Sequence, residues 1–378
     1  GHYFNGAVLR CNGETQTVKA TGSIPASWYF DYNKITAHDS VTDAAFAAAL
    51  NDGISESGLA ETDAYLTSSG TFTSYTAEGL AAMRPAAWQS WGLADGKVVL
   101  GGSLDDAVFA GGDGSETAPF LIRTEAQLRA FAATTADGET YAGQYVALDA
   151  DITLNGDWTP IHSFAGTFDG RGHTVSGMTI GTADAPSKLV SAGFFDVLAN
   201  TARVHDLHLT NASVYVQRSG AALDDRIYAG GLVGGAGTAG SNVRIDNCSV
   251  TGSTISAASG TFAYAGGLAG RLDRENVVTN CWTDIAVTAV SANSPACAGG
   301  LVATIGGSSM IANAAALGDV SVTGVSAEYN WCRAGGLLGS SAYLTHNCYA
   351  SGNVSLQDSA ESVKNVYLGC LIGEQSGG

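Results

Sequence analysis

A short phrase built on glycine and leucine returns through the C-terminal half of the chain at a nearly constant interval. The apolar residue of the phrase falls at positions 194, 232, 268, 301, 337 and 371, so the steps are 38, 36, 33, 36 and 34 residues. The clearest copies are Gly231-Leu232, Gly267-Leu268, Gly300-Leu301 and Gly336-Leu337. Such a period is typical of repeat proteins, in which one structural unit stacks on the next.

A second phrase, Asn-Cys, follows in the same units. Its last position recurs at Cys248, Cys281, Ala314 and Cys348, with steps of 33, 33 and 34 residues. Stacked strands lie about 4.8 Å apart, so we expect Leu on Leu and Asn on Asn ladders, and the Cys position as a small apolar inward rung. A disulfide between rungs is the alternative. Glycine pairs at 230–231, 266–267, 299–300 and 335–336 predict corners where backbones approach too closely for a Cβ.

Between these phrases each unit consists of short alternating pieces, such as Val243-Arg244-Ile245, broken by Gly, Ser and Asn. No unit has the 3.6-residue apolar stripe of a helix. Fifty glycines against six prolines, and 14% charged residues, suit a folded β-rich chain. The sequence therefore predicts an all-β fold, a right-handed parallel β-helix (solenoid) with one or two short capping or bracing helices.

Two parts of the chain differ in pattern. Residues 111–378 carry the repeats, and Thr124-Glu125-Ala126-Gln127 opens a predicted helix near 124–135 that caps or braces the first coil. Residues 1–110 are interpreted as the closing part of a preceding repeat module, with strands, a short helix near 42–51 and a Ser/Thr/Gly-rich loop or hairpin at 54–76. Both ends look cut, and the array is expected to be truncated at its C-terminus.

Charge and cysteine content exclude several classes of function. The formal net charge is −18 with no basic cluster, which disfavours nucleic acid and anionic lipid as partners. No apolar run has the length needed to insert into a membrane. The cysteine number is odd, at seven, and C-x-x-C is absent, so neither a disulfide framework nor a thiolate zinc site is predicted. No cofactor is expected.

Few residues are candidates for a site. Asp224, Asp225 and Arg226 lie in the longest insertion between repeats, where solenoids tend to collect binding groups, and form the binding candidate. Weak calcium candidates are Asp113, Asp149 and Asp151, because acidic extracellular repeats often bind this ion.

Catalytic signatures are weaker still. Asp149 and Asp151, as alternate residues of one strand, would meet the carboxylate spacing of a glycosidase by default, so solvated turn charges are the simpler interpretation. The segment Gly235 to Gly240 spells G-x-G-x-x-G, but the pattern after it predicts a strand where a dinucleotide site needs a helix. The histidines show no ligand spacing; His205 and His208 come closest, and strand alternation is expected to place them on opposite faces. No catalytic residue is predicted.

Several segments resemble those of a known repeat family. Gly111 through Ile122, the predicted helix, Trp158-Thr159-Pro160-Ile161 and Phe164 through His173 resemble the lead-in of bacterial GLUG-motif repeat regions, and the Gly-Gly-Leu-Val-Gly and Asn-Cys phrases resemble GLUG units. The likeness covers about 111–378. It implies a β-helical stalk in an extracellular, adhesin-like bacterial surface protein. In such a stalk the motif residues Gly231, Leu232, Gly267, Leu268, Gly300, Leu301, Gly336, Leu337, Cys248, Cys281 and Cys348 are structural.

The expected function is an extracellular binding or adhesion scaffold that is not an enzyme. It is secreted or attached to a cell surface, with any anchor outside this fragment, and is expected to be a monomer. The expected partner is a host or microbial surface glycan or protein. Two alternatives stay open: a β-helical carbohydrate-active enzyme, either lyase or glycoside hydrolase, and a passive stalk that displays another domain.

Overall fold

The computed structural model describes residues 108–199, 201–220, 226–236, 242–292, 295–324, 331–341, 345–357 and 365–375, and the backbone of six short strands between His2 and Leu100. By its internal contacts the chain divides into Gly1–Ala107 and Val108–Gly378. In the first unit the short strands pair antiparallel as β1 (His2–Phe4) with β2 (Trp28–Phe30), β3 (Ala64–Leu66) with β4 (Phe72–Ser74), and β5 (Trp91–Ala94) with β6 (Lys97–Leu100). The helix predicted near 42–51 lies outside the described residues.

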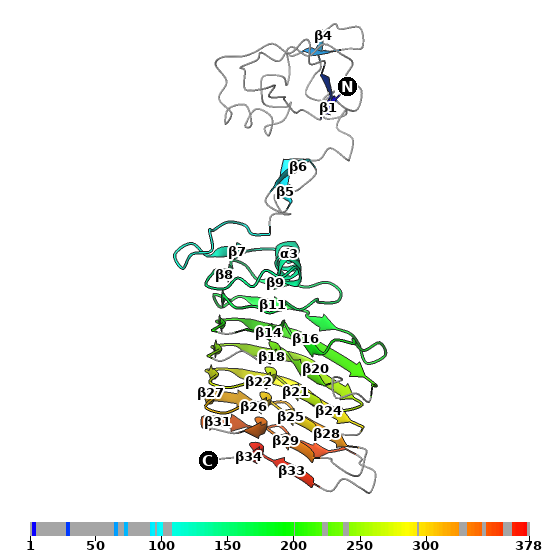
Figure 1. Cartoon of the computed structure of the whole chain (residues 1–378), viewed down its shortest axis with the longest axis vertical. Helices are drawn as coiled ribbons and strands as arrows, with labels where there is room; N and C mark the ends of the chain where they lie inside the picture. Colours follow the sequence, from blue (N-terminus) through cyan, green and yellow to red (C-terminus); the bar gives the residue numbers. More distant parts are fainter. Residues whose placement is uncertain are drawn as a thin grey trace. The chain divides into compact units, whose positions relative to one another are not determined.

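The second unit is a parallel β-helix of about five turns, as the sequence predicts (Figure 1). Successive coils stack on one another from α3 towards β34 (Ile372–Gln375), and all strand pairs of the described solenoid are parallel. Three sheets run along the stack. No described segment crosses back over a sheet as a helix, which is why the repeat can be so short.

The largest sheet has sixteen strands and two walls joined at a bend in β27 (Met310–Ala316), which pairs with strands of both. One wall contains β7 (Phe120–Ile122), β8 (Tyr145–Leu148), β10 (Thr167–Asp169), β15 (Arg203–His205), β19 (Arg244–Asp246), β23 (Val277–Thr279) and β31 (Thr345–Ala350). The other contains β9 (Ile152–Thr153), β11 (Thr174–Ser176), β12 (Thr179–Ile180), β16 (His208–Arg218), β20 (Ser249–Ser259), β24 (Trp282–Ser291), β28 (Val320–Gly324) and β32 (Val354–Leu356).

Two six-stranded sheets complete each coil. The first contains β13 (Ser191–Ala192), β17 (Ile227–Gly230), β21 (Ala263–Gly266), β25 (Ala296–Gly299), β29 (Trp331–Gly335) and β33 (Asn365–Gly369). The second contains β14 (Phe195–Leu198), β18 (Val233–Ala236), β22 (Ala269–Leu272), β26 (Val302–Ile305), β30 (Leu338–Ser341) and β34. The Gly-Leu phrase is the corner between these two sheets.

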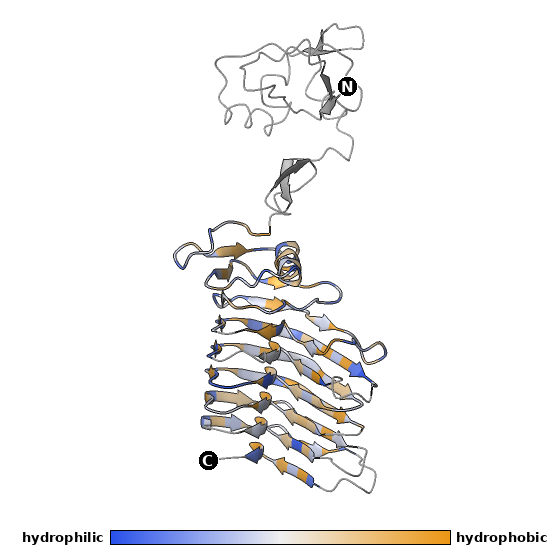
Figure 2. Ribbon diagram, viewed as in Figure 1, coloured by the Kyte–Doolittle hydropathy of each residue, from blue (hydrophilic) through white to orange (hydrophobic). Residues whose placement is uncertain are grey.

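The core is a set of columns in which like side chains lie one above another, and Figure 2 shows hydrophobic residues recurring on the strands of successive coils. Val204, Ile245, Val278 and Ile311 are paired in register, and each is at most 1% exposed. The four leucines of the Gly-Leu phrase are fully buried. The expected leucine ladder is therefore present, and it makes the interior continuous along the solenoid.

The glycine pairs stand where the corner leaves no room for a side chain. A Cβ on Gly300 would lie 2.0 Å from the carbonyl oxygen of Gly336, and one on Gly267 would lie 2.1 Å from that of Gly300. Side chains essentially never approach backbone this closely, so only glycine can occupy these positions.

The cysteine rung faces inward in most of its copies. Cys248 and Cys281 are 1% exposed, Ala314 is 4% exposed, and Cys348 is half-buried. These cysteines are free thiols, so the disulfide alternative does not apply to them. Burial raises the pKa of the Cys248 thiol well above its ordinary value, as a small core side chain requires.

The predicted helix is α3 (Glu125–Ala136), and it is the only helix among the described residues. Thr124 is its N-cap and accepts a hydrogen bond at Oγ1 from the Gln127 amide, 3.2 Å away. The Gln127 side chain turns back to accept from the Arg123 amide, one residue before the partner of an ideal capping box. Phe131 packs at the centre of an aromatic cluster, with its ring centroid 6.0 Å from that of Phe164. The helix thus braces the first coils.

Candidate functional site

A column of residues in left-handed backbone conformation runs along one corner of the solenoid. Its members come directly after β15, β19 and β23 and lie inside β27 and β31 in the following coils. Asp206, Asn247, Asn280, Asn313 and Asn347 have φ values of 54°, 48°, 55°, 52° and 52°. Asn and Asp tolerate this conformation better than other side-chain-bearing residues because their short polar groups bond locally. The geometry of the corner therefore selects a column of amides and carboxylates.

The amides of this column bond to one another across coils. Asn347 donates from Nδ2 to Oδ1 of Asn313 at 2.7 Å, and Asn313 donates in turn to Oδ1 of Asn280 at 3.2 Å. Asn280 donates to Oδ1 of Asp246 at 2.8 Å. All three bonds point towards the N-terminal coils, so the run ends on a carboxylate, which can only accept. The predicted asparagine ladder is therefore a directed chain of hydrogen bonds.

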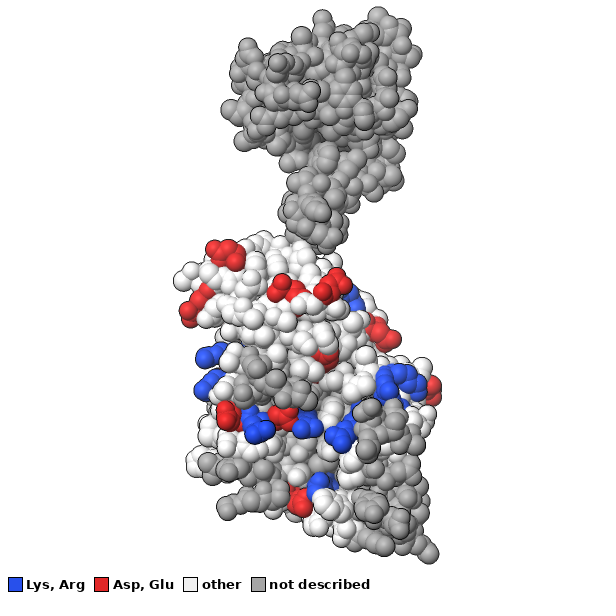
Figure 3. Space-filling model, viewed as in Figure 1, with Lys and Arg blue, Asp and Glu red and all other residues white. Residues whose placement is uncertain are grey.

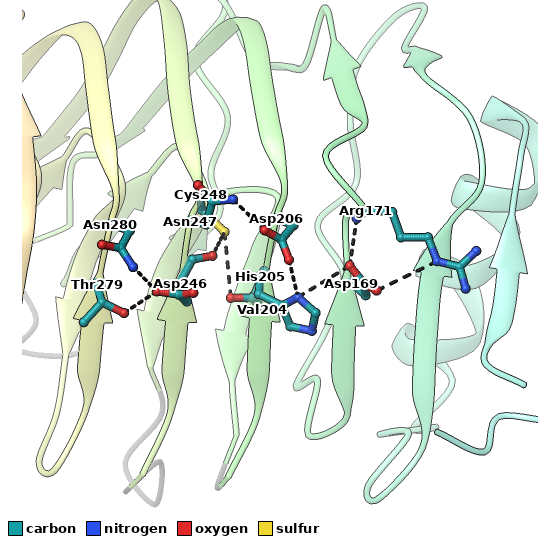
Figure 4. Close-up of polar contacts among 10 residues, drawn as sticks. All are labelled: Asp169, Arg171, Val204, His205, Asp206, Asp246, Asn247, Cys248, Thr279 and Asn280. Carbon is teal, nitrogen blue, oxygen red and sulfur yellow. Dashed lines mark hydrogen bonds and ion pairs between the residues drawn. The ribbon is translucent and has the colours of Figure 1, made fainter. Parts of the chain in front are cut away.

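Asp169, His205 and Asp206 form a compact cluster at the N-terminal end of the same column (Figure 4). Asp169 and His205 are paired in register on β10 and β15, so adjacent coils bring them together. His205 Nδ1 lies 2.8 Å from Asp206 Oδ2 and 3.4 Å from Asp169 Oδ1. The ligand atoms of the three residues lie within 4.8 Å of one another, and each side chain is 31–40% exposed.

Neighbouring groups tune this cluster. The Asn247 amide donates to Asp206 Oδ1 at 2.5 Å and, with His205, holds the pKa of Asp206 below its ordinary value. Arg171 Nε lies 3.8 Å from Asp169 Oδ2 and offsets part of the negative charge. One imidazole nitrogen and two carboxylates are a donor set that suits Zn²⁺ or Mn²⁺. A divalent cation bound here would be held by the imidazole of His205 and the carboxylates of Asp169 and Asp206.

This cluster was not predicted from the sequence. No sequence spacing identifies it, because the pairing of Asp169 with His205 depends on the register between coils. The alternation argument for His205 and His208 also fails. Asp206, in the left-handed conformation, and buried Leu207 separate the two histidines onto different strands.

The calcium candidates lie apart from this cluster and have protein partners. Asp113 accepts from the Ser115 amide at 2.9 Å. Asp149 lies between two arginines, 2.6 Å from Arg123 Nε and 3.2 Å from Arg171. Among the described residues, no metal-ligand group of three or more includes any of Asp113, Asp149 and Asp151.

Asp151 accepts from the Thr174 amide at 2.8 Å and contacts His173 Nδ1 at 3.1 Å. Asp149 and Asp151 do not share a strand as expected, because Asp149 follows β8 and Asp151 precedes β9. The geometry therefore gives no basis for treating them as a glycosidase pair.

The binding candidate is described only in part. Asp224 and Asp225 lie outside the described residues. Arg226 is exposed, and its guanidinium lies over the ring of Phe262, 4.7 Å from the centroid. Phe262 and Tyr264 are stacked with centroids 6.5 Å apart, and Tyr264 stacks on Tyr228 at 5.2 Å. Arg226 thus stands at the end of an aromatic row.

In Figure 3 large parts of the described surface carry no charged residue, and acidic and basic residues lie side by side in a row across the middle of the solenoid. Within the described residues, no helix has the length and apolar character that a membrane crossing requires.

Comparison with known proteins gives limited similarities. No family model matches the chain. A curated protein of Evansella cellulosilytica named "Putative Gly-rich membrane protein" is 33% identical over 128 residues, which is 31% of this chain. The match spans only 14% of that protein's length. A solved structure titled "putative immunoglobulin A1 protease from Bacteroides ovatus" is 22% identical and has a TM-score of 0.46, covering 72% of this chain and 88% of the other.

Proposed function

We propose that this chain is a non-catalytic binding scaffold of an extracellular bacterial surface protein, acting in adhesion. The observation that carries the proposal is the directed ladder of exposed asparagines on a continuous core. Asn247, Asn280, Asn313 and Asn347 are all exposed, and they repeat at the spacing of the coils. A rigid column of identical polar groups offers a partner several equivalent contacts at once, which favours recognition of a repetitive surface.

The ionisation of the carboxyl groups supports binding over hydrolysis. A glycosidase needs a general acid whose pKa is raised by burial. Here a hydrogen bond from Arg123 holds the pKa of Asp149 below its ordinary value, and the Thr174 amide does the same for Asp151. The two carboxylates that the sequence analysis weighed as a catalytic pair are thus tuned away from acid catalysis.

The proposal extends to location and partner. The chain would be secreted or attached to a cell surface, and a host or microbial glycan or protein would be its partner. The buried cysteines are free thiols that act as core residues. They are therefore compatible with an extracellular location.

Array binding by the isolated chain tests this function. The chain is expected to bind a subset of glycans or surface proteins on printed arrays and to release no product from pectin, xylan or host glycans. Turnover that disappears when Asp224 or Asp225 is replaced by Asn would overturn the non-catalytic proposal. Absence of any binding on both arrays would leave the passive stalk as the better account.

A further inference from the structure

Two aromatic side chains stand beside the asparagine ladder on its C-terminal coils. Trp282 is 40% exposed and Tyr349 is 59% exposed. Each follows a ladder asparagine by two residues, so both aromatic residues are on the outer surface directly after the asparagine corner. We call Asn280, Trp282, Asn313, Asn347 and Tyr349 the asparagine face.

The strand register determines which residues lie on either side of Trp282. Trp282 is paired with Ser249 in one neighbouring coil and with Ala315 in the other, and Ala315 is paired with Tyr349. Small side chains therefore flank Trp282 on both sides. The backbones of Trp282 and Tyr349 are two strand spacings apart, roughly 10 Å. A flat ring that contacts one aromatic side chain on each side needs about 7–8 Å between them. One ring-shaped group therefore fits above Ala315, between Trp282 and Tyr349.

The ladder amides keep hydrogen-bonding capacity for a ligand. An asparagine side chain offers two N–H donors and an oxygen with two lone pairs. Asn313 uses one donor towards Asn280 and accepts one bond from Asn347. One N–H and one lone pair remain on this exposed side chain. A pair of vicinal hydroxyls, which both donate and accept, complements this arrangement.

The charge of the face selects against anionic partners. Asp284, the next exposed residue along β24 after Trp282, is a carboxylate, and its acceptor oxygens suit hydroxyl groups while repelling phosphate, sulfate or carboxylate. The face offers no free strand edge at Trp282, because β24 pairs with β20 on one side and with β27 and β28 on the other. A peptide therefore has no place there to add as a strand.

We propose that the asparagine face binds a neutral glycan. A pyranose ring lies above Ala315, its C–H groups contact the electron-rich faces of Trp282 and Tyr349, and its hydroxyls bond to the ladder amides. Longer glycans run along the column, because the amides repeat in each coil. This inference rests on the proposed binding function and names its partner class.

The test uses the full chain on an array of neutral, sialylated and sulfated glycans together with proline-rich peptides, followed by titration calorimetry with the best glycan. Wild-type protein is expected to bind neutral glycans. Trp282→Ala is expected to weaken binding about tenfold or more, since it removes a central aromatic anchor. Ala315→Arg fills the space between the rings and is expected to abolish binding without removing a contact group.

Trp331→Ala is the matched control, because Trp331 is 45% exposed on β29 of a different sheet. It is expected to bind as wild type does, and thermal melting confirms that all variants are folded. Unchanged glycan binding by both Trp282→Ala and Ala315→Arg overturns this site while the scaffold function stands. Binding confined to acidic glycans or peptides, or no glycan binding by folded wild-type protein, also overturns it. If the folded wild-type protein binds nothing on either the glycan arrays or the surface-protein arrays, the scaffold function is overturned as well.

Discussion

Asn313 donates from Nδ2 to Oδ1 of Asn280, 3.2 Å away, although 33 residues separate the two in the chain. Both are in the left-handed conformation, at the same corner of adjacent coils. The bond exists only because the coils stack without an offset. It therefore links the local choice of asparagine at a corner to the register of the whole solenoid.

Replacement of Asn313 separates its effect on the backbone conformation at the corner from its hydrogen bonds between coils. Asn313→Ala is expected to lower the free energy of unfolding by about 1–3 kcal/mol. Alanine lacks the polar group that favours the left-handed conformation, and the change removes both ladder hydrogen bonds. Asn313→Gly keeps the backbone conformation and is expected to cost less. Urea denaturation measures both. Equal losses in the two variants would mean that backbone strain is not what selects asparagine at this corner.

A buried charge should destroy the stack. Leu268 is fully buried in the leucine ladder, so Leu268→Asp or the equivalent Leu301→Asp is expected to cost about 3–5 kcal/mol and to unfold the array. Leu189→Asp is the control, since Leu189 is 38% exposed. Circular dichroism melting gives the comparison. An unchanged melting temperature in Leu268→Asp would count against the inward ladder.

The glycine corner predicts a contrast between two glycine-to-alanine changes. Gly300→Ala places a Cβ 2.0 Å from the Gly336 carbonyl oxygen and 2.7 Å from the Ala316 Cβ, so coils must separate, at a cost of about 3 kcal/mol or more. Gly235→Ala meets nothing closer than 3.7 Å and is expected to be nearly neutral. Chemical denaturation of both proteins measures the difference, and similar stabilities would contradict the role of close approach.

The Asp206 carboxylate makes stability depend on pH in the acid range. Its pKa is lowered by the Asn247 amide and by His205, so its contribution is complete above the unfolded pKa of about 4 and is lost as pH falls through the lower folded value. Asp206→Asn keeps a residue suited to the corner but removes the charge. The melting temperature of the variant is expected to lie below that of wild type at neutral pH and to converge with it once the pH falls below the folded pKa of Asp206.

Asp184→Asn, at an exposed position outside the cluster, is the control for that comparison. A wild-type advantage over Asp206→Asn that persists undiminished in acid would show that the carboxylate charge is not its source.

The sequence by itself determined the coil. The spacing of Leu232, Leu268, Leu301 and Leu337 predicted stacked units, and the adjoining glycine pairs predicted a corner. The recurring asparagines predicted a ladder, because equivalent positions repeat with the period. The helix at Glu125–Ala136 followed equally from its capping residue and apolar spacing.

Only the tertiary structure decided which side chains of different coils meet. Asp169 and His205 are 36 residues apart, in the first coils, where the length of the repeat still changes from one coil to the next. Their contact therefore depends on the register between β10 and β15, which cannot be derived from the spacing of the repeats. Likewise, the place of Trp282 between Ser249 and Ala315 depends on pairing across three coils. A repeat fixes what each coil is made of, but the polar clusters and the asparagine face arise where non-identical residues of stacked coils come into register.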